Sequence, residues 1–185
     1  MNDIVNLSAT QIAQEIKAGK VSAREVVDAH IGRIEAVNPR INAVVIPLFE
    51  EARKGAEAAD AAQKRGDALG ALHGVPITIK EQFLVKGTAT TLGLPSQKDH
   101  RAEDDGPLVK RLREAGAIIL GKTNVSQMLL YIESDNPVYG RTNNPWNLDR
   151  SCGGSSGGGS GGSGGQTSWP GGSGGSVTWW PLQRQ

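Results

Sequence analysis

The chain has 185 residues, a formal net charge of +1 and a single cysteine, Cys152. This length is enough for one domain with a buried core. The near-neutral charge argues against electrostatic binding to nucleic acid or to an anionic membrane, and one cysteine excludes a disulfide framework within the chain. No secretory signal is visible at the N-terminus, and no apolar stretch approaches the roughly 18 residues of a membrane-spanning helix. We therefore expect a cytoplasmic protein without nucleic-acid or membrane partners.

The first part of the chain carries one helix-start signal twice. Ser8 is followed by Gln11, and Ser22 by Glu25, in the spacing of a capping box. Apolar residues then recur at helical spacing after each signal. The pattern predicts a short helix followed by a longer one, which should end at Asn38–Pro39 because the residue before a proline is biased away from helical geometry.

The next segments alternate between strand and helix. Residues 41–46 are rich in β-branched side chains and predict a strand. Residues 50–65 are rich in Ala, Glu and Lys and predict a surface helix ending at Gly66. Residues 75–80 are short and apolar enough for a further strand.

Alternation continues in the second half. A helix is predicted to open at Asp105, with Pro107 in its first turn, and to end at Gly116. Residues 117–120 predict a buried strand and residues 124–131 another helix. This order of elements predicts an α/β fold in which helices cover a sheet.

The composition changes abruptly near residue 159. All 19 acidic residues lie at or before Asp149, and from residue 151 onward the only charged side chain is Arg184. The Gly- and Ser-rich residues 159–185 are too poor in apolar side chains to offset the entropy of ordering. We expect residues 1–158 to form the N-terminal portion of an enzyme-like domain and residues 159–185 to be a disordered, low-complexity tail.

Two chemical patterns are set aside. Residues 116–123 match the phosphate-loop pattern, but their middle residues are Ala-Ile-Ile-Leu, which favour a buried strand over a loop that binds phosphate. The three histidines and Cys152 have no metal-ligand spacing. No metal or other cofactor is therefore expected.

A lysine at a strand end and a Gly-rich turn that carries serines are the strongest chemical signals. Alternation along residues 75–80 places Thr78 and Lys80 on one side of the sheet. Lys80 could act as a base if burial lowered its pKa. The glycines of residues 153–158 would allow a close approach to a substrate, although such a run is equally typical of a flexible linker.

Four segments in this order resemble the amidase signature family: residues 74–81, 116–124, 140–146 and 153–158. The resemblance covers about residues 7–158, and the joint match of several motifs makes it specific. It implies a mixed β-sheet covered by helices, and an enzyme that hydrolyses small-molecule amides through a Ser–cis-Ser–Lys catalytic set.

The resemblance also implies roles for individual residues. Lys80 matches the family lysine, which is the base, and Ser155 matches the bridging serine, which follows a cis peptide bond expected between Gly154 and Ser155. The remaining candidate is Ser176, 21 residues after Ser155, as the nucleophile that would form an acyl-enzyme.

The chain departs from the family pattern after the glycine turn. Residues 159–170 replace an apolar helical segment, and the aspartate that precedes the family nucleophile is absent before Ser176. We therefore expect a frameshifted or truncated amidase whose native reading ends near residue 158, inactive in this form. Two alternatives stay open: an interaction module that docks on another chain without catalysis, and an amidotransferase-like subunit that releases ammonia from glutamine and needs a partner.

Overall fold

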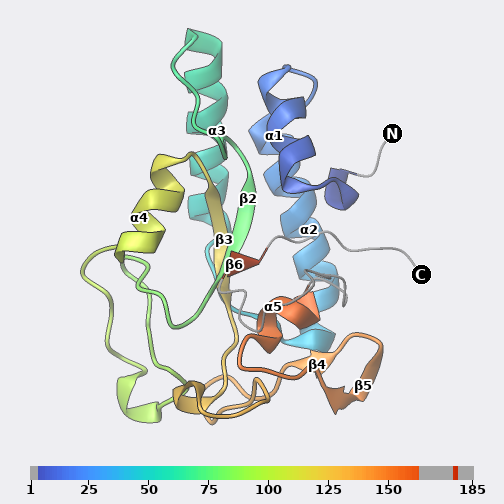
Figure 1. Ribbon diagram of the computed structural model, residues 1–185, viewed down its shortest axis with the longest axis vertical. Helices are drawn as coiled ribbons and strands as arrows, with labels where there is room; N and C mark the ends of the chain where they lie inside the picture. Colours follow the sequence, from blue (N-terminus) through green and yellow to red (C-terminus); the bar gives the residue numbers. More distant parts are fainter. Residues whose placement is uncertain (1–3, 163–176, 179–185) are drawn as a thin grey trace.

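A small mixed sheet forms the centre of the protein in a computed structural model that describes residues 4–162 and 177–178 (Figure 1). Its strands lie in the order β1–β3–β2–β6. They are β1 (Val44–Pro47), β2 (Pro76–Lys80), β3 (Ile118–Thr123) and β6 (Val177–Thr178). Strands β2 and β3 run parallel, while β1 and β6 are antiparallel to their neighbours. The expected mixed sheet of an α/β fold is confirmed.

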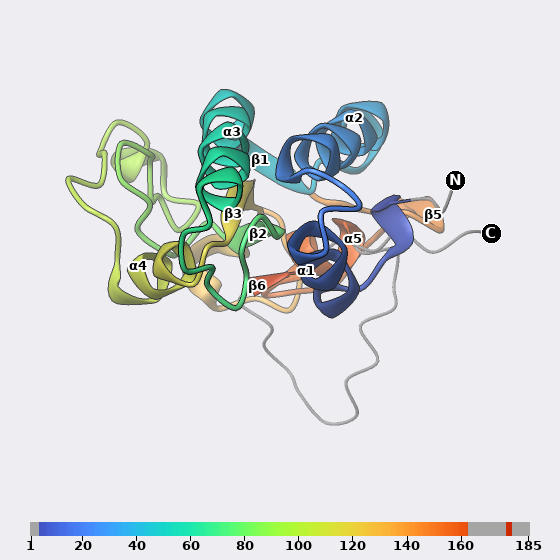
Figure 2. The same cartoon turned by 90° about the horizontal axis from the view of Figure 1, so that it is seen from above.

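Helices surround this sheet. They are α1 (Ala9–Lys17), α2 (Ala23–Ile41), α3 (Phe49–Arg65), α4 (Pro107–Glu114) and α5 (Gly157–Gly162), with the 3₁₀ turns η1 (Ile4–Asn6), η2 (Pro95–Gln97) and η3 (Gln127–Leu129). Helices α2 and α3 pack against each other and against β3. Helix α4 lies on the side of β2 and β3 away from α1 and α2 (Figures 1 and 2). Every residue of β2 and β3 is buried, as expected for strands covered on both faces.

Local start and stop signals account for the helix ends that the sequence predicts well. Both capping boxes form: Ser8 Oγ accepts the N–H of Gln11 at 3.3 Å, and Ser22 Oγ accepts that of Glu25 at 3.1 Å. Helix α3 ends at Gly66, whose φ of 77° lies in the left-handed region that glycine adopts without steric cost. These predicted helices are confirmed.

The predicted end of the second helix at Asn38–Pro39 is wrong. Helix α2 includes Pro39 and ends at Ile41, so the strand predicted over residues 41–46 starts only at Val44. The side chain of Asn38 explains the difference, because its Oδ1 accepts the N–H groups of Ala43 and Val44 at 2.9 and 2.8 Å. These bonds hold the chain that leaves the helix, which therefore tolerates the proline in its last turn.

The predicted helix over residues 124–131 is also wrong. Only the short turn η3 forms there, and Met128 within it has a φ of 50°. Asn124 diverts the chain, because its buried amide donates to Gly140 O at 2.9 Å and to Thr142 Oγ1 at 3.0 Å. These partners are distant in sequence, so the local pattern gives no sign of them.

Two smaller predictions need correction. Helix α4 is capped by Gly106 and not by Asp105, whose carboxylate instead accepts the N–H of Lys86 at 2.8 Å and pairs with Arg113. The tail predicted as disordered contains two ordered segments: α5 covers Gly157–Gly162, and β6 pairs with β2. The division of the chain at residue 158 into domain and tail stays a prediction.

The segments that follow β2 and β3 gather at one end of the sheet, the lower end in Figure 1. The hairpin of β4 (Asn143–Asn144) and β5 (Asn147–Ser151) lies at this end too and leads into the glycine turn. Side chains at the carboxyl ends of β2 and β3 therefore face the loops that carry most of the polar residues. The candidate site lies here.

Candidate active site at the end of strand β2

Lys80 is the last residue of β2 and is almost fully buried, with 5% of its surface exposed. It pairs in register with Thr123 of β3, so its backbone is fixed by the parallel ladder. Burial penalises the charged amine and lowers the pKa of Lys80 below its ordinary value. A lysine in this setting can lose its proton more easily than one at the surface.

The glycine turn brings Ser155 to this lysine. The peptide bond between Gly154 and Ser155 is cis, as the family resemblance implies. Lys80 Nζ donates a hydrogen bond to Ser155 Oγ at 2.9 Å, although the two residues are 75 positions apart. The expected proximity of these two side chains is confirmed, while their catalytic roles stay predictions.

A buried serine that the sequence pattern does not single out holds the turn in place. Ser134 is fully buried, and its Oγ accepts the N–H of Gly157 at 2.8 Å. Its own N–H donates to Gly153 O at 3.0 Å. Both bonds connect the turn to a loop that carries no recognisable motif, so only the three-dimensional contact could have identified Ser134.

Close packing explains a glycine in the turn. A Cβ at Gly154 would lie 2.7 Å from the carbonyl carbon of Glu133, which is closer than such atoms approach in proteins. Since the obstructing atoms belong to the backbone, they cannot rotate away. Glycine at position 154 therefore allows the turn to lie directly on the chain at Glu133.

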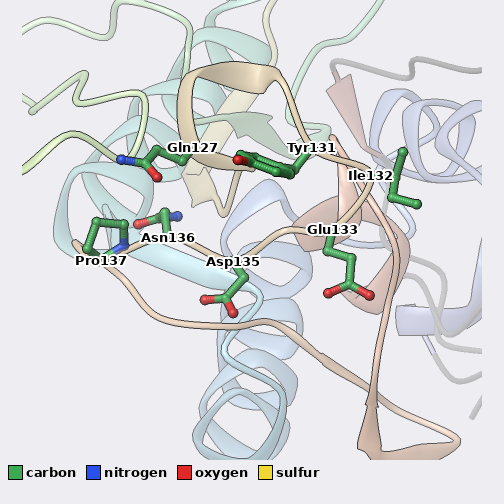
Figure 3. Close-up of a pocket in the computed structure, with 7 residues that line it drawn as sticks. All are labelled: Gln127, Tyr131, Ile132, Glu133, Asp135, Asn136 and Pro137. Atoms are coloured by element: carbon green, nitrogen blue, oxygen red, sulfur yellow. The ribbon is translucent and has the colours of Figure 1, made fainter.

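A cavity of about 600 Å³ lies beside this contact. Its wall is formed by one segment of the chain after β3: Gln127, Tyr131, Ile132, Glu133, Asp135, Asn136 and Pro137 (Figure 3). The carboxylates of Glu133 and Asp135 point to the same side of the ribbon. Tyr131 and Ile132 are largely exposed, at 66% and 83%. The wall thus combines apolar and acidic groups, and it adjoins the turn that carries Ser155.

The third predicted site residue, Ser176, lies outside the described residues. The described strand β6 begins at the next residue, Val177, which pairs with Ile79 of β2. Among the residues that the structure describes, no cluster of three or more His, Cys, Asp or Glu side chains could hold a metal ion. No helix within the same residues is long and apolar enough to cross a membrane.

The phosphate-loop pattern at residues 116–123 forms no loop. Most of it is the buried strand β3, as predicted from its apolar residues. Its lysine, Lys122, is fully buried, and its amine contacts oxygens of residues 88–90. A lysine within an otherwise apolar strand is the sequence signal that could have marked this residue.

Comparisons with known proteins agree with this geometry. The model of the Amidase family matches residues 25–175, which extends past residue 158. Indoleacetamide hydrolase of Bradyrhizobium diazoefficiens is 49% identical over 150 residues, covering 81% of this chain and 29% of that protein. A glutamyl-tRNA(Gln) amidotransferase subunit of Streptomyces coelicolor is 39% identical over 157 residues, covering 85% and 32%. A solved structure of fatty acid amide hydrolase superposes with a TM-score of 0.81 at 34% identity, covering 85% and 28%. The chain thus spans about a third of the length of these relatives.

Proposed function

Because this chain belongs to the amidase family, we propose that it carries the lysine and the bridging serine of an amide hydrolase. The observation that supports this most directly is the hydrogen bond of 2.9 Å between Lys80 Nζ and Ser155 Oγ. The proposed substrate is a small molecule with a carboxamide bond, as the printed names of the relatives suggest for those proteins.

In the proposed reaction Lys80 is the general base. Its amine must be neutral to accept a proton, and the lowered pKa that burial causes favours this state. Ser155 transfers the proton: its Oγ takes one from the nucleophilic hydroxyl and gives its own to Lys80. The nucleophile, which we propose to be Ser176, then attacks the amide carbonyl and forms an acyl-enzyme. The amine leaves with the returned proton, and water releases the acid.

The proposed relay can be tested in a chimera. Residues 25–158 would replace the matching segment of Bradyrhizobium diazoefficiens indoleacetamide hydrolase, which is 49% identical to this chain over 150 residues. We expect the chimera to hydrolyse indoleacetamide, and Lys80→Ala or Ser155→Ala to lower kcat about a hundredfold or more, the usual contribution of a positioned proton-transfer group. Lys110→Ala, at an exposed lysine of α4, is the control and should leave kcat unchanged. An active chimera that tolerates both changes in the relay would refute the proposal.

The 185-residue chain alone gives a second test. We propose that it is inactive, because an expected apolar segment is replaced by glycine-rich sequence between Ser155 and Ser176. The chain would be assayed with a simple aromatic amide beside its Lys80→Ala variant. Equal background rates are expected. Turnover that disappears in the variant would overturn the proposed inactivity and at the same time support the relay.

A further inference from the structure

Two charged side chains lie fully buried beside the site and take no part in the proposed relay. Glu81 directly follows Lys80, and Lys122 lies on β3, paired with Ile79 in the parallel ladder. Burying either charge is costly unless hydrogen bonds compensate it. Their partners therefore indicate what these residues do.

The carboxylate of Glu81 holds the far end of one loop, residues 88–92. It accepts the backbone N–H of Thr91 and that of Leu92, the latter at 3.1 Å. A third bond, at 3.0 Å, comes from the hydroxyl of Tyr139. The backbone of Glu81 is itself fixed, since its N–H donates to Thr123 O at 2.9 Å.

The amine of Lys122 holds the near end of the same loop. It donates to Ala89 O at 2.6 Å, to Thr90 Oγ1 at 2.9 Å and to Thr88 Oγ1 at 3.3 Å. All three acceptors precede the two residues that Glu81 binds. The 88–92 loop is thus tied to the ends of two neighbouring strands, by an acceptor on one and a donor on the other.

The 88–92 loop continues this connection to the wall of the cavity. Leu92 O accepts the N–H of Met128 at 2.8 Å, so the loop supports the turn η3. The chain after η3 lines the cavity and reaches Glu133, whose backbone packs against Gly154. Both members of the Lys80–Ser155 contact therefore adjoin parts of the chain that the 88–92 loop holds.

We propose that Glu81 and Lys122 are a pair of positioning residues, which hold the 88–92 loop to the sheet and thereby keep Lys80 against Ser155. The geometry of the pair is independent of catalysis; only its importance for turnover rests on the proposed function. Removing one member leaves buried N–H or C=O groups of the loop without partners, so either loss should free the whole loop.

The test uses the full chain and two readouts that need no enzymatic activity. Amide hydrogen exchange followed by NMR reports the opening of the loop, and competitive acetylation followed by mass spectrometry reports the accessibility of each lysine amine. The variants are Lys122→Met, which keeps the apolar stem, and Glu81→Gln, which keeps the shape. Lys110→Met is the matched control, because this exposed lysine pairs only with Asp104 at the surface.

In both variants we expect the amides of Thr91, Leu92 and Met128 to exchange about 10- to 100-fold faster, as the loss of a hydrogen bond to a charged group implies. Acetylation of Lys80, measured against an exposed lysine, should rise in the same variants and stay at the wild-type level in Lys110→Met. The double variant should exchange no faster than the more affected single variant, since either loss already frees the loop.

Other results would overturn the proposal. Unchanged loop exchange would show that the pair does not hold the loop, and faster exchange with unchanged Lys80 acetylation would show that the loop does not position Lys80. Strictly additive effects would show two separate supports. If the two variants fail to fold, Tyr139→Phe and Thr90→Val each remove one hydrogen bond and should give smaller changes of the same kind. An inactive chimera would refute the proposed function without altering either readout.

Discussion

Two lysines at the same end of the sheet differ in what surrounds their amines. Lys80 Nζ donates to one hydroxyl, Ser155 Oγ, which could itself pass on a proton. Lys122 Nζ donates to a carbonyl oxygen and two threonine hydroxyls of the 88–92 loop, and these three bonds hold the amine to the loop. Burial lowers the pKa of both lysines, and it lowers that of Lys122 to about 8. A low pKa alone therefore does not identify a catalytic base; the partner does.

The lowered pKa of Lys122 predicts a pH dependence of stability. Between about 8 and the ordinary 10.5, the unfolded chain binds the proton that the folded protein has lost. The free energy of unfolding should therefore rise with pH across this window, by up to roughly 3 kcal/mol from this one group. Urea unfolding of wild type and Lys122→Met at pH 7.5, 9 and 10 measures it. The rise should be smaller in the variant; two parallel pH profiles would contradict the assignment.

The residue-level predictions succeed where a motif carries the information. The order of the motifs is enough to bring Lys80 and Ser155 together, because each lies in a segment with a recognisable pattern. Glu81, Lys122 and Ser134 were not predicted as a group. Their partners are backbone groups and hydroxyls of loops without patterns, so nothing in the sequence connects them before the chain is folded.

At the scale of elements, the start of α2 is held by another helix as well as by its own cap. Ser22 supplies the capping box, but the carboxylate of Asp60 on α3 also accepts the N–H of Ala23 at 2.7 Å and that of Arg24 at 3.1 Å. The first N–H groups of a helix have no partner within the helix and carry partial positive charge. Asp60 therefore fixes how α2 and α3 lie against each other.

Replacement of Asp60 should cost more than loss of an ordinary surface carboxylate. We expect Asp60→Ala to lower the free energy of unfolding by about 1–2 kcal/mol, the usual range for losing a helix cap. Asp67→Ala is the matched control: Asp67 follows the end of α3 and pairs only with Arg65 at the surface, so its loss should cost less than about 0.5 kcal/mol. Chemical denaturation of the three proteins decides the matter, and equal costs for both variants would remove Asp60 from this role.

Element boundaries were predictable where the determining groups are local. The caps at Ser8 and Ser22 act within three residues, and both were predicted correctly. The two wrong boundaries share a cause, because in each an asparagine side chain binds backbone outside the element in question. Asn38 secures the chain beyond Pro39, and Asn124 binds residues from 134 to 142. Periodicity reports neither kind of contact.

On the scale of the whole molecule, three distant segments meet at Gly158. A Cβ there would lie 2.4 Å from the N of Asn124 and 2.9 Å from the O of Ala43. The N–H of Asn124 donates to that same Ala43 oxygen at 2.9 Å. The first turn of α5 therefore rests directly on the hydrogen bond that joins the start of β1 to the end of β3. This contact connects the glycine turn with the sheet.

Gly158→Ala tests whether that contact supports the fold. Because the obstructing atoms are backbone, the added methyl group must push α5 away from the sheet, and we expect a loss of about 2–3 kcal/mol in the free energy of unfolding. Ser155 lies one turn earlier, so the protection of the Lys80 amine from acetylation should fall as well. Gly32→Ala is the control: no atom lies within 4 Å of its added Cβ on the exposed face of α2, and it should stabilise the protein by about 0.5–1 kcal/mol. If Gly158→Ala behaves like Gly32→Ala in both measurements, α5 does not rest on the sheet, and the Lys80–Ser155 contact has to be held by the loops alone.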